Sequence, residues 1–127
     1  MEYWYLTAAA SLSFAGMIFH GYFGGRIYKR NIFKSDLEPL TKSLSLVSWH
    51  VFTVFLFVSA STLAFISYNP EFYVGAYPVI GVNILGAALF ALLGFGKHRV
   101  LLKMPGSYLM AGTALLSWIG VSQGSSV

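Results

Sequence analysis

The sequence contains no cysteine and few charged residues, and each absence excludes a class of chemistry. Without cysteine the chain has no disulfides, no thiolate metal sites and no cysteine nucleophile. Charged residues make up only 9% of it, against about a quarter in soluble domains. Because only 4 residues are acidic, hydrolysis by carboxylates has little support, and we predict no enzymatic chemistry.

What the sequence does have is apolar: 57% of its 127 residues are hydrophobic and 17% are aromatic. Its charges leave uncharged windows that each exceed the roughly 20 residues needed to cross hydrocarbon. We therefore predict an all-α fold, an integral membrane four-helix bundle forming a single domain over residues 1–127. The windows are 3–25, 43–70, 72–96 and 104–127, and the predicted helices are about 3–28, 43–68, 72–96 and 105–124.

The basic residues predict the orientation of this bundle. All 8 lysines and arginines lie in two connecting segments, 26–42 and 97–103. Since positive charge marks cytoplasmic loops, we predict that both loops are cytoplasmic and that both termini lie outside. The chain is then a multi-pass protein of the bacterial inner (plasma) membrane, with the lipid bilayer as its partner. The net charge of +4 is interpreted as a topology signal, and no nucleic-acid partner is expected.

Two histidines lie inside the first two predicted helices at a similar depth. His20 precedes Arg26 by six residues, and His50 follows Lys42 by eight. At 1.5 Å per residue, both lie on the order of 10 Å inside the cytoplasmic boundary, on antiparallel neighbours. An ionisable side chain within a membrane span indicates a functional site. The alternative is that each histidine is neutral and structural, hydrogen-bonded near the interface.

The segments "FHGYFGGRIYKRNIF" and "LVSWHVFTVFL" resemble a widespread family of small bacterial four-helix membrane proteins. In that family the first helix ends in His-x3-Gly-x-Arg and the second opens with Trp-His and a nearby Thr. The resemblance covers about the first half of the chain and implies no activity. That family commonly has an acidic residue where this chain has Gly25. The resemblance implies a ligand-binding site formed by His20, Gly24, Arg26, Trp49, His50 and Thr53.

These observations predict a protein that binds, senses or conducts a small ligand or ion at the histidine pair, as a homo-oligomer. One alternative is an electron-transfer protein with a single haem b and with His20 and His50 as axial ligands, since the surrounding glycines leave room for a porphyrin. Another is an accessory subunit that docks on a larger membrane complex through glycine and alanine faces. The cofactor is otherwise left open, with His20 and His50 as the candidate ligands if a haem or another metal is bound.

Asn83 is predicted to serve helix packing. It lies near the middle of the third helix, where an unpaired amide is costly. We expect a hydroxyl from another helix, that of Ser13, Ser59 or Thr113, to satisfy it.

Overall fold

The computed structural model describes residues 3–124, and this range contains helices and short connections but no strand. The all-α prediction is therefore confirmed. The elements in chain order are α1 (Tyr3–Ile18), η1 (Phe19–Gly24), α2 (Gly25–Lys34), α3 (Pro39–Tyr68), η2 (Pro70–Gly75), α4 (Ala76–Phe95), η3 (Arg99–Lys103) and α5 (Pro105–Gly124). Of the short elements, η1 is a π-helical turn and η2 and η3 are 3₁₀ turns.

The first two helical rods are longer than predicted. The first runs through α1, η1 and α2 to Lys34 instead of ending near 28, and α3 begins at Pro39 instead of 43. Lysine and arginine end an apolar window, but they are good helix formers and do not end a helix. The chain turns where Ser35 adopts an extended conformation, and Pro39 then occupies the first position of α3.

Three helices in the described range are long and apolar enough to cross a membrane. They are Trp4–Lys34, Pro39–Tyr68 and Pro70–Phe95, the last of which includes η2. The helix α5 matches its predicted bounds, but polar side chains along it leave it less apolar than the other three. These include Ser107, Thr113, Ser117 and Gln123.

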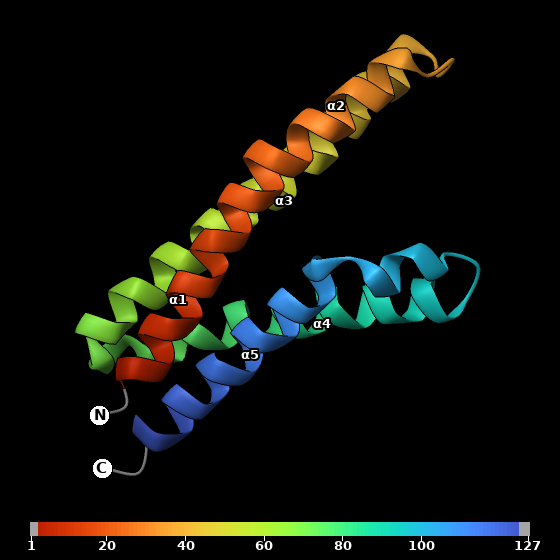
Figure 1. The fold of residues 1–127 in the computed structure, drawn as a ribbon. Helices are drawn as coiled ribbons and strands as arrows, with labels where there is room; N and C mark the ends of the chain where they lie inside the picture. Colours follow the sequence, from red (N-terminus) through yellow and green to blue (C-terminus); the bar gives the residue numbers. More distant parts are fainter. Residues whose placement is uncertain (1–2, 125–127) are drawn as a thin grey trace.

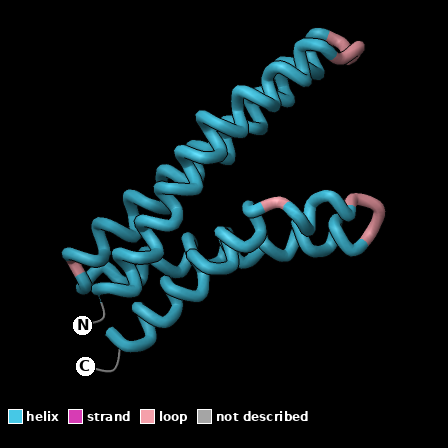
Figure 2. Tube along the Cα trace, viewed as in Figure 1, coloured by secondary structure: helices cyan, strands magenta, loops and turns pink. Residues whose placement is uncertain are grey.

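The helices form two hairpins that diverge like the arms of a V (Figure 1). The first hairpin pairs the rod α1–η1–α2 with α3, and the second pairs α4 with η3 and α5. Near the start of α1 and the end of α5, α1 packs against both α3 and α5 and joins the hairpins. The connections 35–38 and 96–98 lie at the two separated tips, as the tube in Figure 2 shows.

Apolar side chains fill the joined end of the V, and a glycine lets two of its helices approach closely. Leu6 and Ala9 of α1 belong to a buried cluster with residues of α3, α4 and α5. A Cβ atom placed on Gly120 of α5 would lie 2.9 Å from Cγ of Leu6, closer than side chains normally approach. Glycine at this position therefore sets the distance between α1 and α5, in the way that small residues bring membrane helices together.

The hydrogen bond of Asn83 differs from the prediction. Asn83 is fully buried, but its Nδ2 donates to the carbonyl of Val79 on its own helix at 2.9 Å. Within residues 3–124, its Oδ1 and the Oγ of buried Ser59 have no hydrogen-bond partner. The expected bond to a hydroxyl of another helix is therefore not formed.

Gly120→Ala should destabilise the protein by about 1–3 kcal/mol, because the added methyl forces Leu6 and Tyr5 to move within a packed contact. The matched control is Gly81→Ala, where a Cβ meets nothing within 4 Å. This control should stabilise α4 by up to about 1 kcal/mol through helix propensity. Equilibrium unfolding in mixed SDS and mild-detergent micelles measures both, and equal effects at the two positions would contradict the packing described.

Candidate functional site

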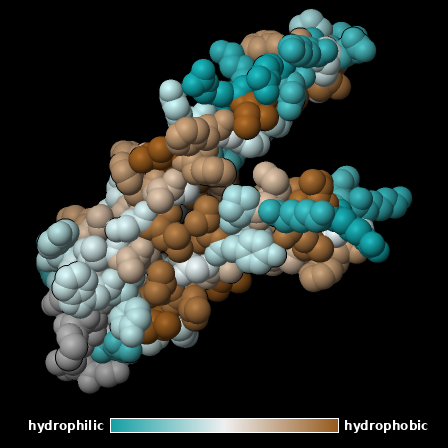
Figure 3. Space-filling model, in the orientation of Figure 1, coloured by the Kyte–Doolittle hydropathy of each residue, from teal (hydrophilic) through white to brown (hydrophobic). Residues whose placement is uncertain are grey.

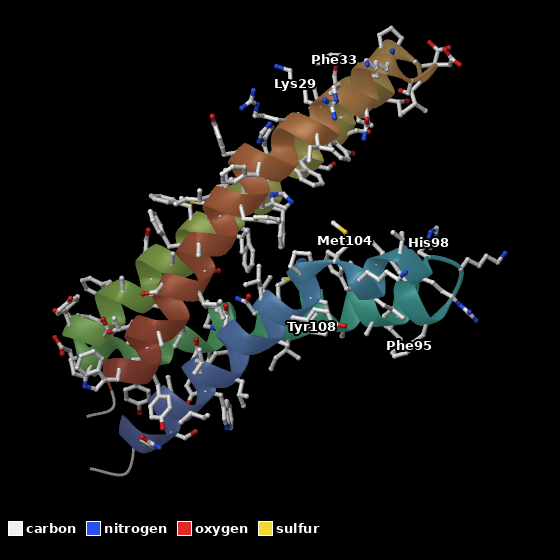
Figure 4. The ribbon with its side chains drawn as sticks, in the orientation of Figure 1. Lys29, Phe33, Phe95, His98, Met104 and Tyr108 are labelled. Atoms are coloured by element: carbon white, nitrogen blue, oxygen red, sulfur yellow. The ribbon has the colours of Figure 1, made fainter. Side chains whose placement is uncertain are left out.

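A cavity of about 190 Å³ lies between the two hairpins, and we call it the inter-hairpin cavity. Both hairpins line it, and no charged side chain of the described range does so. Figure 4 shows Met104, one of the lining residues, on the edge of the second hairpin that faces the first. The lining residues are Gly16, Phe19, His20, Gly24, Trp49, Phe52 and Leu56 of the first hairpin and Phe90, Leu101, Met104, Pro105, Gly106, Leu109 and Met110 of the second.

The π-helical turn η1 carries His20 into this cavity. In this turn the backbone N–H of Gly25 donates to the carbonyl of His20, five residues earlier. The same carbonyl accepts a second hydrogen bond from Nε1 of Trp49 at 3.2 Å. Single π-helical turns within α-helices are rare and are frequent at functional sites. Here the wide turn lets a side chain of α3 reach a carbonyl of the first helical rod.

Three contacts fix the imidazole of His20. Its Nδ1 is hydrogen-bonded to Oγ1 of Thr53 at 3.0 Å. Its ring stacks on Trp49, with centroids 4.0 Å apart and an interplanar angle of 14°. The ring of His20 also meets that of Phe52 edge-on, with centroids 4.8 Å apart and an interplanar angle of 71°. The remaining ring nitrogen, Nε2, has no hydrogen-bond partner within residues 3–124.

Glycines allow the first helical rod to approach α3 at this level. A Cβ on Gly21 would lie 2.7 Å from Cγ2 of Thr53, and a Cβ on Gly24 would lie 3.0 Å from Cζ2 of Trp49. Tyr28 also stacks on Trp49, with centroids 4.2 Å apart, so the indole lies between two rings. The aromatic stack and the glycine contacts together hold His20 in one orientation.

The structure brings four of the six predicted site residues together and places two outside the cavity. His20, Gly24 and Trp49 line the cavity, and Thr53 does not line it but is hydrogen-bonded to His20. His50 is exposed and does not line the cavity. It lies beside Gly25, where an added Cβ would be 3.9 Å from Cε1 of His50. The other residue outside the cavity is Arg26, which is exposed and lies over the ring of Tyr22 at 5.5 Å, with its Nη1 donating to the hydroxyl at 3.4 Å.

The residues present do not fit a haem held between His20 and His50. A porphyrin would need a planar gap between the first helical rod and α3, but Gly21 and Gly24 bring these helices into direct contact. Over the described range there is no group of three or more histidine, cysteine or acidic side chains that could hold another metal ion.

Sequence reasoning missed the half of the cavity that the second hairpin supplies. Leu101, Met104 and Leu109 carry no pattern that points to a site, because only the packing of α1 on α5 brings them opposite His20. On α3, by contrast, Trp49, Phe52 and Leu56 lie three and four residues apart. That spacing puts them on one helix face and could have indicated an apolar wall beside His20.

Trp49→Phe should lower the free energy of unfolding by about 1–2 kcal/mol, because it removes the hydrogen bond to His20 and part of the aromatic stack. The matched control is Trp118→Phe. Trp118 is 53% exposed, and its one ring contact within residues 3–124 is edge-on with Tyr77. Its replacement should therefore change stability by less than about 0.5 kcal/mol. Circular dichroism during unfolding in SDS and detergent mixtures measures both, and indistinguishable values would contradict a structural role for the Trp49 contacts.

Comparison with known proteins gives no relative from which a role could be transferred. A scan against protein-family models, a search of curated proteins and a search of solved structures each found no match to this chain.

Proposed function

We propose that the protein is a multi-pass membrane protein that binds a small, mostly apolar ligand in the inter-hairpin cavity, without enzymatic chemistry of its own. The observation that carries this proposal is the lining. It is apolar apart from His20 and Trp49, and the indole N–H of Trp49 is already bonded to a carbonyl. His20 therefore offers a single polar contact within apolar walls, the usual composition of a small-molecule site.

The size of the cavity supports a ligand with one ring or a short chain. Its volume is about 190 Å³. An engineered apolar protein cavity of about 150 Å³ binds benzene. The inter-hairpin cavity has room for a substituted ring of that kind, or for part of a larger ligand that extends between the arms.

The distribution of side chains supports placement in a bilayer. Hydrophilic atoms gather at the tips of both arms, and apolar atoms lie between the tips and the joined end (Figure 3). Lys29 lies toward the tip of the first arm and His98 at that of the second (Figure 4). We infer from the positive charge of the tips that they are cytoplasmic, with both termini outside, in the bacterial inner membrane. A ligand could then enter the cavity from the bilayer.

The other predicted activities are related to this site in different ways. Sensing fits it, because a ligand that contacts both arms would favour one separation between them. Conduction of an ion requires a polar pathway, which a cavity with one imidazole does not supply, so such a path would lie between subunits of a homo-oligomer. An accessory subunit would use the exposed apolar faces for a larger complex. The haem alternative has less support, since helix contact closes the gap it needs.

The proposed topology predicts opposite labelling of two single-cysteine variants, which the cysteine-free chain makes straightforward. Leu37→Cys lies in the connection 35–38, and Gln123→Cys lies near the end of α5. In intact spheroplasts, a membrane-impermeant maleimide should label Gln123→Cys at once and Leu37→Cys only after permeabilisation. Labelling of Leu37→Cys without permeabilisation would overturn the proposed orientation.

Ligand binding can be tested with durene, a tetramethylated benzene ring, as the probe. In protein carrying ¹³C-methyl methionine, Met104 and Met110 line the cavity and Met17 does not, so Met17 reports nonspecific partitioning. Durene should shift the methyl signals of Met104 and Met110 saturably and leave that of Met17 unchanged.

Two variants test this binding with the same substitution, leucine to phenylalanine, at two positions, one in the cavity and one outside it. Leu101→Phe fills part of the cavity and should weaken durene binding at least about fivefold, since overpacking a filled site costs about 1–3 kcal/mol. Leu85→Phe changes a side chain that is 71% exposed on α4 and should leave binding unaltered. Equal shifts at all three methionines, or no effect of Leu101→Phe, would count against the proposed function.

A further inference from the structure

The hydrogen bond between Thr53 and His20 indicates which ring nitrogen carries the proton. The hydroxyl of Thr53 can donate one hydrogen, and Nδ1 of His20 at 3.0 Å is its only hydrogen-bond partner within residues 3–124. If Thr53 donates to Nδ1, a neutral imidazole carries its proton on Nε2. In the other tautomer Nδ1–H donates to Oγ1, and the Thr53 hydroxyl hydrogen is left without an acceptor at a tight helix contact. In the Nε2–H tautomer the unpaired hydrogen instead faces the cavity, where a bound ligand can accept it. The group that His20 offers to a ligand is therefore an N–H donor.

The surroundings of this donor select a neutral partner. Among the described residues, neither an acidic nor a basic side chain lines the cavity. A charged ligand would lose its hydration there without an opposite charge to compensate. The complementary group is an uncharged acceptor such as a carbonyl oxygen.

The walls of the cavity select a flat ligand. Aromatic side chains line it from three elements, with Phe19 on η1, Phe52 on α3 and Phe90 on α4. Aromatic rings interact favourably with other rings in stacked or edge-on arrangements. The flexible thioethers of Met104 and Met110 adapt to the outline of such a ring.

Taken with the proposed function, on which this inference rests, the geometry points to a ligand of the quinone class. We propose that the inter-hairpin cavity holds a neutral planar ring whose carbonyl oxygen accepts a hydrogen bond from the Nε2–H of His20. Thr53 is the positioning residue that fixes this tautomer. The open side between the arms leaves room for a substituent of the ring to continue into the bilayer.

The experiment compares two probes that have the same pattern of methyl groups. Duroquinone and durene carry the same four methyl groups on a six-membered ring, but only duroquinone has carbonyls. Each is titrated into ¹³C-methyl-methionine protein, with Met104 and Met110 as reporters and Met17 as the internal control. Duroquinone should bind the native chain about fivefold to tenfold more tightly than durene, as expected for one added hydrogen bond. In His20→Phe the two probes should bind equally.

The outcomes separate this inference from the proposed function. If durene and duroquinone bind the native chain equally, or if His20→Phe keeps the preference, the quinone inference fails while the cavity remains a ligand site. If neither probe shifts Met104 or Met110, the proposed function fails as well.

A second measurement does not depend on any variant. Two-bond ¹H–¹⁵N spectra of the imidazoles show which nitrogen of His20 is protonated. Protonated Nε2 supports the inference, and protonated Nδ1 overturns it.

Discussion

The direct contact between the first helical rod and α3 is the constraint on which the site depends. Gly21 and Gly24 let the backbone of η1 come so close to α3 that Thr53 can reach the imidazole of His20 and Trp49 can reach its carbonyl. A Cβ at Gly21 would press on Thr53 and a Cβ at Gly24 would press on Trp49, so each change acts on a side chain that makes one of these hydrogen bonds. The contact thus joins helix packing and ligand recognition, because the same approach that stabilises the hairpin also orients the nitrogen facing the cavity.

The sequence predicts the local features of this protein better than its tertiary ones. Long uncharged windows predict the helices, since a chain in hydrocarbon must satisfy its backbone hydrogen bonds internally. The same windows misplace the ends of the first two rods, because a charged residue closes an uncharged window but does not end a helix. The position of the turn is set by backbone conformation, because Ser35 is extended after α2 and Pro39 occupies the first position of α3.

The candidate site shows the same division. His20, Trp49 and Thr53 can be associated from the sequence because they lie on two neighbouring helices at one depth. His50 satisfies the same depth argument and yet lies outside the cavity, since depth does not fix the side of the helix on which a residue lies. The second hairpin's share of the lining follows from the angle between the hairpins, which no local pattern encodes. For that reason the predicted pair of histidines becomes one histidine facing apolar walls.

The π-helical turn also sets the angular phase of everything that follows it in the first rod. Each residue turns an α-helix by about 100°, so the extra residue in η1 rotates α2 by that amount relative to an unbroken helix. Its present phase places Tyr28 on Trp49 and turns Arg26 away from the cavity. A homologous chain shortened by one residue between Phe19 and Gly24 would keep its composition and its hydropathy profile. It would nevertheless present a different face of its basic segment to α3.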